Sequence, residues 1–321
     1  MDLIYMNADK EDLGVLQDYT FDLAFGASEN DFECKVVRDK HCCEAGYYLY
    51  YEGAEYGGII DSIRVDTANE EITYSGRTWH GILESKVIEP DGDYLTLSGE
   101  ANVVLSTLID RMGLSKLFTV PPYDSGITIS SYKMNRYVAG YTGIRKMLKV
   151  FGGKLQVSFH EGCVYLSAVP MVDYSQDEQF DTDQIDFVIR KNSNPINHVI
   201  CLGKGDLSER EVIHIYADEN GNTGTTQSLT GMQEVVAVYD YANAESSEEL
   251  MQGGINMIRE SWTSDEISFN FSANDKTYDV GDVVGAKEYV TGIEVASEIT
   301  KKIVSIKDNT TTISYKVGEQ L

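Results

Sequence analysis

Two short stretches, one near each end of the chain, share a strand–turn–strand pattern. In the first, residues 57–88, Ile63 and Val65 alternate with polar residues before an Asp/Asn turn, after which Ile72 and Tyr74 alternate in the same way. Successive side chains of a strand point to opposite faces, so alternation with a period of two around such a turn predicts a β-hairpin.

The second stretch, residues 303–318, repeats this pattern with a turn at 307–310 and then Ile313 and Tyr315. The shared Ile-x-Tyr after the turn suggests one hairpin used twice, and therefore two related β domains. Hairpins of this kind also occur in any all-β protein, so the pattern alone leaves both readings open.

The charge balance is strongly acidic, with 26 basic residues against 52 acidic ones and a net charge of -26. Non-specific binding to nucleic acid depends on lysine and arginine side chains that neutralise phosphates. The composition therefore argues against a protein that grips DNA or an anionic membrane. It is compatible with one that encloses DNA without holding it, and also with a soluble surface that repels other copies.

The sequence gives no sign of a membrane span or a secretion signal, because no apolar run approaches about 18 residues and the start lacks a basic region. The five cysteines have no C-x-x-C spacing, which predicts free thiols in a reducing compartment. Adjacent cysteines do not chelate one zinc ion easily, so His41-Cys42-Cys43 is not interpreted as a metal site.

Three domains are expected along the chain. Residues 1–92 predict a first β-barrel-like domain, because short strands separated by turns are typical of barrels and sandwiches. Its strands are expected at 3–6, 21–25, 32–37, 47–51 and 83–88, together with the first hairpin. Glu89-Pro90-Asp91-Gly92 then marks a boundary.

Residues 93–175 predict a small α+β module. A first helix is expected over 100–112, where apolar residues recur every three or four positions and Glu100 lies in the first turn. A second helix is expected over 143–151 with Thr142 as its N-cap. Strands at 154–160 and 163–169 form the hairpin that completes this helix–helix–hairpin module.

Residues 176–321 predict a second β-barrel-like domain. It follows an acidic linker at 174–183 and contains strands at 186–189, 198–202 and 211–217, a helix near 246–262 that a capping box opens, and a strand that includes Phe269 and Phe271. The segment 218–229 begins like a calcium loop but has Thr223 where the EF-hand needs glycine, so an EF-hand is rejected. Overall, the chain is predicted to be mainly β with α+β insertions.

No catalytic signature is present, so the chain is not predicted to be an enzyme and no catalytic, cofactor-binding or metal-binding residue is assigned. His80 lies between Trp79 and Gly81 and is expected to be structural rather than a catalytic base. A glycosidase needs only two well-placed carboxyl groups, which the sequence of so acidic a chain can neither locate nor exclude.

Several segments together resemble tail hub proteins of phages and prophages, the siphophage tail-associated family that is related to contractile-tail baseplate hubs. They are residues 75–88, the helix–helix–hairpin module, residues 202–221 and residues 278–318. The most specific pieces are the Gly281-Asp282 turn after Tyr278 and the segment Gly203-Lys204-Gly205-Asp206. The resemblance covers nearly the whole chain and carries no catalytic residues.

The resemblance implies two β-barrel-like tube domains per chain and a homotrimer that forms a ring matching a sixfold tail tube. Its implied partners are a distal tail protein, a tape measure and receptor-binding or fibre proteins, with DNA passing through non-specifically and acidic side chains expected to face the bore. The implied location is the virion tail, assembled in the host bacterial cytoplasm. Receptor binding or cell-wall cleavage is expected from other proteins, because residue 321 lies just past the last strand.

Two alternatives remain at this stage. A carbohydrate-binding or glycan-cleaving β protein would explain the aromatic and acidic residues but not the intervening α+β module. The hub of a phage-like bacterial injection system would share the fold and differ in its genomic setting.

Overall fold

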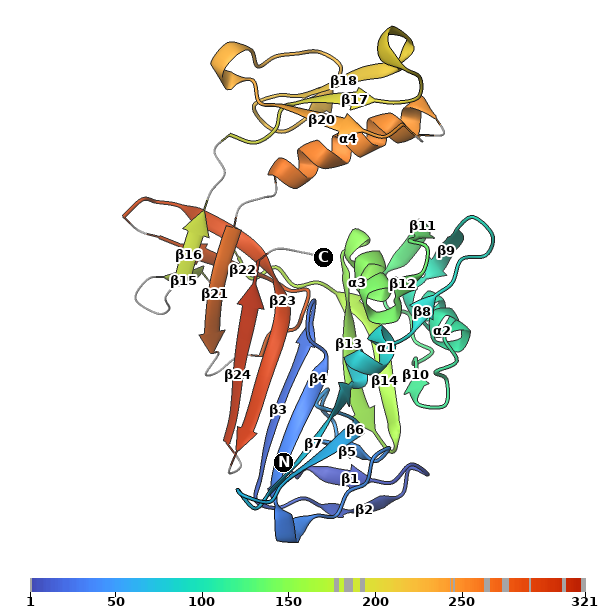
Figure 1. Ribbon diagram of the computed structural model, residues 1–321, viewed down its shortest axis with the longest axis vertical. Coiled ribbons are helices and arrows are strands. Elements are labelled where there is room, and N and C mark those ends of the chain that lie inside the picture. The colour runs from blue at the N-terminus through green and yellow to red at the C-terminus, as the bar shows by residue number, and fades with distance from the viewer. Residues whose placement is uncertain are drawn as a thin grey trace. The chain divides into compact units, whose positions relative to one another are not determined.

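The computed structural model describes residues 2–175, 179–181, 187–190, 194–242, 244, 246–262, 266–272, 277–288, 290–307 and 310–318 (Figure 1). The chain divides into two compact units, each of which is described separately. Unit 1 comprises Met1–Phe187 with Ser268–Leu321, and unit 2 comprises Val188–Ile267.

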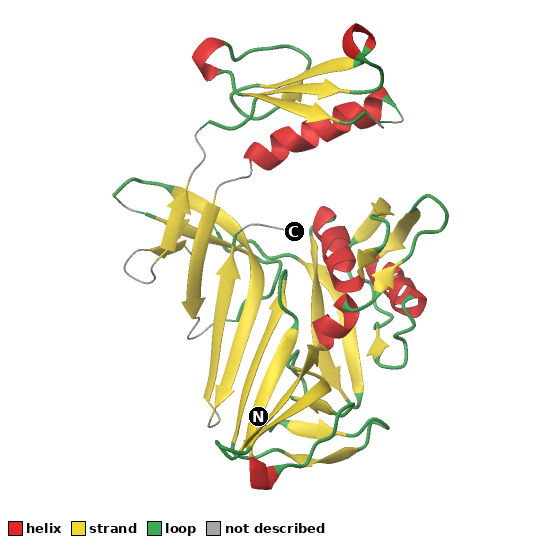
Figure 2. Cartoon of the chain, viewed as in Figure 1, coloured by secondary structure: helices red, strands yellow, loops and turns green. Residues whose placement is uncertain are grey.

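A large sheet dominates unit 1, and strands outnumber helices throughout, which confirms the prediction of a mainly β chain (Figure 2). Its order is β16-β21-β24-β23-β3-β4-β7-β6-β5-β1-β2, with β22 paired to β23 and β15 paired to β22. The N-terminal strands are β1 (Ile4–Met6), β2 (Asp12–Val15), β3 (Tyr19–Gly26), β4 (Asp31–Val37), β5 (Tyr48–Tyr50), β6 (Gly57–Asp66) and β7 (Glu71–Thr78). The C-terminal strands are β15 (Gln179–Asp181), β16 (Phe187–Arg190), β21 (Glu266–Ser272), β22 (Val283–Lys287), β23 (Glu294–Lys307) and β24 (Thr310–Val317). Within the described residues the order is open, because β16 and β2 are not paired with each other.

The period-two alternation of these strands separates a buried face from a polar one. Phe21 on β3 pairs with Cys34 on β4, which in turn pairs with Tyr74 on β7, and all three side chains are fully buried. Residues directly opposite in an antiparallel ladder share a face, so these apolar side chains form one continuous row. Val304 on β23 extends the same core from the C-terminal end of the chain.

Both predicted hairpins are present. β6 and β7 pair from Gly58↔Thr78 to Asp66↔Glu71, and β23 and β24 pair up to Lys307↔Thr310. Asp66 closes the first turn, because its Oδ1 accepts hydrogen bonds from the backbone N–H groups of Ala68 and Asn69. Residues 308 and 309, at the tip of the second hairpin, lie outside the described residues.

A helical module packs beside the large sheet. It contains α1 (Trp79–Glu84), α2 (Ala101–Arg111), α3 (Gly140–Val150), the long hairpin β13 (Gly153–His160) and β14 (Cys163–Pro170), and short strands. The short strands are β8 (Val87–Ile88), β9 (Leu95–Glu100), β10 (Phe118–Thr119), β11 (Thr128–Met134) and β12 (Val138–Ala139). The two predicted helices and the predicted hairpin are all present, and their apolar faces meet in one core.

The strand expected at 83–88 is largely wrong. Residues 79–84 form helix α1 because Thr78 acts as an N-cap, with its hydroxyl accepting a hydrogen bond from the N–H of Gly81 at 3.2 Å. Only Val87 and Ile88 are extended. The aromatic and apolar residues of this segment are buried all round, and that pattern does not distinguish a short buried helix from a strand.

Two helix starts also differ from the prediction. Glu100 is the N-cap of α2 rather than a first-turn residue, and its carboxylate accepts a hydrogen bond from the N–H of Val103 at 2.9 Å. Thr142 lies inside α3, which begins at Gly140. The Thr142 hydroxyl donates to Glu84 at 2.8 Å instead of capping the helix, so its partner comes from α1.

Unit 2 is a four-stranded sheet of order β19-β18-β17-β20 with one helix on it. Its strands are β17 (His198–Leu202), β18 (Val212–Ala217), β19 (Thr223–Gly224) and β20 (Val236–Asp240), and its helix is α4 (Ser247–Trp262). The predicted capping box opens α4, since Ser246 Oγ accepts from the N–H of Glu249 at 3.2 Å. Val199, Cys201 and Ile215 pack against the helix.

The three-domain division stays a prediction, and the observed units relate to it in a simple way. Both expected boundaries, near residues 92 and 175, fall inside unit 1, whereas unit 2 lies within the expected third domain. Residues 176–178 and 182–183 of the expected acidic linker at 174–183, and the side chains of Phe269 and Phe271, lie outside the described residues.

The order of strands is repeated within the large sheet. β3-β4-β7-β6-β5-β1 and β16-β21-β24-β23-β22-β15 follow the chain in the same order and have the same neighbours. The two sets differ in the direction of one strand, because β1 pairs antiparallel with β5 while β15 pairs parallel with β22. They differ also in an insertion, since unit 2 separates β16 from β21 where a short turn joins β3 to β4.

Two tyrosines at matching positions of the repeat make similar hydrogen bonds. Tyr74 on β7 accepts a hydrogen bond from the N–H of Cys42 at 3.2 Å, and Tyr315 on β24 accepts from the N–H of Tyr278 at 2.9 Å. Both side chains are fully buried. Each hydroxyl therefore fixes the loop that precedes the matching strand, β5 in the first case and β22 in the second.

We expect Tyr74→Phe and Tyr315→Phe to lower the free energy of unfolding by similar amounts, about 1–2 kcal/mol each, because each removes the hydroxyl of a buried side chain that accepts a hydrogen bond from a backbone N–H group. Urea denaturation followed by circular dichroism measures the change. The exposed Tyr123→Phe is the control and should be neutral. A loss at only one of the two positions would argue against equivalent roles.

Candidate functional site

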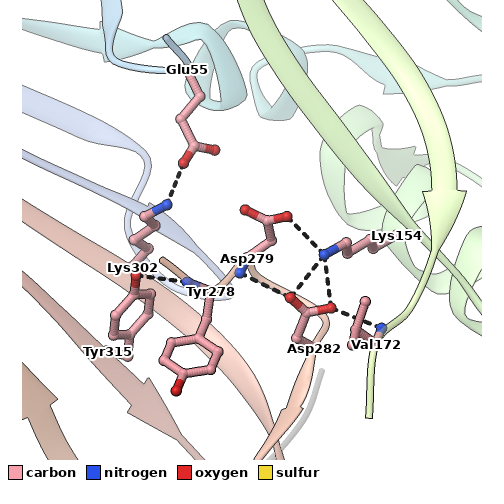
Figure 3. A network of polar contacts seen from close by, with 8 residues as sticks. All are labelled: Glu55, Lys154, Val172, Tyr278, Asp279, Asp282, Lys302 and Tyr315. Atoms are coloured by element: carbon pink, nitrogen blue, oxygen red, sulfur yellow. Dashed lines mark hydrogen bonds and ion pairs between the residues drawn. The ribbon is translucent and has the colours of Figure 1, made fainter. Parts of the chain in front are cut away.

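A network of buried charges lies where three segments of unit 1 meet (Figure 3). Lys154 on β13 donates to Asp279 at 2.7 Å and to both carboxylate oxygens of Asp282 at 2.8 Å. Asp282 also accepts from the N–H groups of Val172 and Asp279, at 2.9 and 3.0 Å. A fully buried carboxylate is thus surrounded by donors, which is the condition under which a buried charge is tolerated.

A second ion pair continues the network toward the N-terminal strands. Lys302 on β23 donates to Glu55, in the connection between β5 and β6, at 2.6 Å. The Lys302 ammonium also lies 5.7 Å from the ring centre of Tyr56 and 5.8 Å from that of Tyr315. The aromatic faces and the carboxylate together stabilise a cation that is almost completely buried.

Burial and pairing act in opposite directions on these groups. Burial alone would lower the pKa of Lys154 and Lys302, but the neighbouring carboxylates raise both above the usual range, so both stay charged. Burial raises the pKa of Glu55 despite the attraction of Lys302. Each acidic side chain that faces this region is bound to a lysine, so the arrangement joins segments rather than supplying a free acid or base.

His80, which the sequence predicts to be structural, lies beside the network. Its ring stacks on Phe25 with centroids 4.2 Å apart, and only 2% of the residue is exposed. Burial, together with the positive charges of Arg145 and Lys302, lowers the pKa of His80 to about 3. The imidazole is therefore neutral near pH 7, and its conjugate acid is far too strong for His80 to act as an effective base there.

A cavity of about 380 Å³ adjoins the network, with Glu55, Tyr56, His80, Asp279 and Lys302 in its wall. Its two carboxyl groups are Glu55 and Asp279, the kind of pair that the glycan-cleaving alternative requires. Both are engaged by buried lysines. The cavity therefore does not favour that alternative.

The polar face of the large sheet is the second candidate site. It is formed by the side chains of β6, β7, β4, β3, β23 and β24 that point away from the buried row. They are Ser62, Arg64, Asp66, Glu71, Thr73, Ser75, Arg77, Asp31, Glu33, Lys35, Val37, Thr20, Asp22, Ala24, Lys301, Ile303, Ser305, Lys307, Thr310, Thr312, Ser314 and Lys316. Acidic and basic residues occur on it in nearly equal number, separated by serine and threonine.

Several of the charges of this face are paired with neighbours. Arg77 binds Asp61 through both Nε and Nη2 at 2.8 Å, and Ser305 donates to Asp22 at 2.5 Å. Lys301 pairs with Glu29. The acidic excess of the chain is thus not gathered here, because this face combines short polar side chains with acidic and basic residues in nearly equal number.

The His41-Cys42-Cys43 segment considered in the sequence makes other contacts. His41 Nδ1 lies 2.9 Å from the Tyr74 hydroxyl, and Cys43 is buried. No group of three or more histidine, cysteine or acidic side chains in the described parts of the chain is arranged to hold a metal ion. No helix within the described residues is both long and apolar enough to cross a bilayer.

Sequence reasoning missed the network itself. Lys301-Lys302 reads as an exposed basic pair, and neither Lys154 nor Asp282 lies in a motif that predicts burial. The signal closest to it is the Gly281-Asp282 turn after Tyr278, which is part of the resemblance to tail hub proteins. Gly281 has φ +106, so the turn that delivers Asp282 adopts a backbone conformation that glycine tolerates best.

Comparison with known proteins gives the fold. No family model and no curated protein matches the sequence. Among solved structures, the chain is similar to a prophage MuSo2 43 kDa tail protein from Shewanella oneidensis (TM-score 0.59, 11% identity, 98% of this chain and 97% of that one). It is also similar to prophage tail protein gp18 from Listeria monocytogenes (TM-score 0.58, 15% identity, 100% and 95%) and to a tail protein from Neisseria meningitidis (TM-score 0.55, 11% identity, 99% and 96%). The chain has the fold of phage and prophage tail proteins, and these similar structures are named as tail proteins rather than as enzymes.

We expect Asp282→Asn to lower the free energy of unfolding by about 3 kcal/mol, because it leaves the buried Lys154 ammonium with a weaker partner. Arg38→Gln is a matched control that breaks an exposed ion pair, Arg38–Glu70 at 3.0 Å, and should cost less than about 1 kcal/mol. Urea denaturation compares the two. Equal losses would show that the buried network contributes no more than a surface pair.

Proposed function

We propose that this protein is a structural component of a phage or prophage tail, in which three chains form a hub ring between the sixfold tail tube and the threefold tip. The observation that carries the proposal is the repeated strand order within one sheet. Three chains with two similar sets of strands each present six similar elements around a ring, which is the symmetry that a sixfold tube requires. The shared fold with tail proteins supports the same role.

In this proposal the two sets of strands are the two tube domains, and the α+β module predicted at 93–175 lies between them in sequence. Each tube domain is a set of strands in a common sheet rather than a closed barrel of its own. The ladder between β3 and β23 joins the two sets within one chain, from Lys301↔Gly26 to Lys307↔Thr20.

The polar face of the sheet is the surface we assign to the bore. Its acidic and basic side chains are nearly equal in number, so the face as a whole carries little net charge with which to retain phosphates, and DNA would pass without being held. This differs from the expectation that acidic side chains lining the bore repel DNA, because the acids of this face are balanced by bases. The proposal locates the protein in the virion tail, assembled in the host cytoplasm with a distal tail protein, a tape measure and receptor-binding or fibre proteins as partners.

The proposal predicts a closed trimer of about 107 kDa, three times the 35.8 kDa of one chain. Mass measurement by light scattering over a range of concentrations tests this, because association by mass action should fill the trimer as concentration rises. The matched control is the protein in mild urea, which should give the mass of one chain. A dimer, a tetramer or an open series of larger species would contradict a threefold ring.

A further inference from the structure

Two histidines of unit 2 are in contact on the face of its sheet that α4 does not cover. His198 on β17 and His214 on β18 precede Val199 and Ile215, whose side chains pack against the helix. Successive side chains of a strand point to opposite faces, so both imidazoles lie on the other face. His198 Nε2 is 2.8 Å from His214 Nδ1. Two side chains of the type that most often binds transition metals are therefore side by side.

His198 is held by its other neighbours. Its Nδ1 lies 2.7 Å from Glu234 Oε1, and that oxygen also accepts a hydrogen bond from Gln227 Nε2 at 2.8 Å. The buried His198 ring stacks on Tyr216, directly opposite in the ladder, with centroids 4.4 Å apart. Because a carboxylate can only accept, His198 Nδ1 carries the proton and Nε2 keeps its lone pair. His198 is thus oriented with Nε2 available as a ligand.

His214 is exposed and has more freedom. Since His198 Nε2 is the acceptor, the proton between the two rings belongs to His214 Nδ1, and the second nitrogen of His214 is an acceptor. The His214 ring is paired in the ladder with Ile200 and lies 6.2 Å from the ring centre of Tyr216. It can therefore turn, or carry its proton on Nε2 instead of Nδ1, without disturbing the core of unit 2.

The spacing of the two nitrogens is close to that of two ligands of one metal ion. Zinc binds imidazole nitrogen at about 2.0–2.1 Å, so two nitrogens on a tetrahedral ion lie about 3.3 Å apart. The 2.8 Å contact between His198 and His214 would have to open by about 0.5 Å, and the exposed ring of His214 can supply this movement. A carboxylate on the far nitrogen, as Glu234 is here, commonly orients a metal-binding histidine and raises its basicity.

We propose that His198 Nε2 and His214 Nδ1 bind a divalent transition-metal ion that prefers imidazole, with Zn²⁺ as the example, and that Glu234 is a positioning residue. The ion takes the place of the proton between the rings, and that proton moves to Nε2 of His214. Glu234 faces the other nitrogen of His198 and does not bind the ion. The described residues hold no group of three metal ligands, so water or a side chain of another molecule completes the coordination.

This site is independent of the proposed ring, because all of its residues belong to unit 2 of one chain. Calorimetric titration of the full-length protein with zinc chloride near neutral pH tests it. We expect one ion per chain, and an affinity at least about tenfold lower in His198→Gln and in His214→Gln. The affinity should also fall as the pH is lowered, because protons compete for the same two nitrogens.

His160→Gln is the matched control. His160 also has a carboxylate beside its Nδ1, Glu52 Oε1 at 3.4 Å, and an aromatic neighbour, Tyr165, with centroids 5.8 Å apart. It has no second histidine in contact among the described residues, so its loss should leave zinc affinity unchanged. Retention of full affinity by the His198 and His214 variants, or an equal loss in His160→Gln, would show adventitious binding only and overturn the proposal. A wild-type chain that does not bind zinc would also overturn it.

Proton NMR of the wild-type protein keeps the test valid if a variant fails to fold. Zinc should shift the imidazole C–H signals of two of the five histidines, His198 and His214. Shifts at other histidines in their place would contradict the site. Glu234→Gln should weaken binding about tenfold yet keep both shifts at saturating zinc, because it removes the group that orients His198 and leaves both ligands. Unchanged affinity in Glu234→Gln would overturn the positioning role.

Discussion

The ladder between β3 and β23 is the interaction on which the rest of unit 1 depends. It joins residues 20–26 to residues 301–307, which are nearly the whole chain apart in sequence, and makes one sheet from two sets of strands. Without it the C-terminal hairpin would have no apolar row to extend, and Val304 and Ile306 would lose the core formed by the N-terminal strands. Pairing over such a separation closes a very long loop, so it carries a larger entropic cost than the closure of a local hairpin.

The buried ion network favours one register of the ladder between β3 and β23 and one junction between the sheet and the helical module. Lys302 stands on the buried face of β23 opposite Phe25, and only Glu55 and two aromatic rings make that position tolerable for a cation. A slip of one residue in the ladder would turn Lys302 to the polar face and place Lys301 in the core. Asp282 and Lys154 impose a similar condition on the junction with the helical module, because each is buried and removal of either would take a charged partner from the other.

Local patterns predicted what is decided locally. The two hairpins, the helix α2, the hairpin of the helical module and the cap of α4 all follow from periodicity and turn or cap residues within a few positions. The shared Ile-x-Tyr pattern is short but informative, since the hydroxyls of Tyr74 and Tyr315 each accept a hydrogen bond from the loop that precedes the corresponding strand. Local patterns gave the wrong prediction at residues 79–84. The apolar run there has no clear period, and it forms a helix whose N-cap is Thr78.

The order of strands and the buried charges could not be predicted in this way. Which strand lies beside β23 depends on the shape of both edges after folding, and nothing in residues 20–26 identifies residues 301–307 as their partner. Lys154, Asp282 and Lys302 are ordinary surface residue types whose burial follows only from that arrangement. The acidic composition likewise did not reveal that the polar face of the sheet is nearly balanced.

The insertion of unit 2 has a consequence for how such proteins diversify. The chain leaves through β16 and returns through β21, and these strands are hydrogen-bonded neighbours in the sheet. A short turn joins β3 to β4 in the first set of strands. At the matching position in the second set the sheet accommodates about 80 residues, which have a hydrophobic core of their own. Unit 2 can therefore be exchanged, enlarged or deleted in evolution without a change in the strand register of the large sheet.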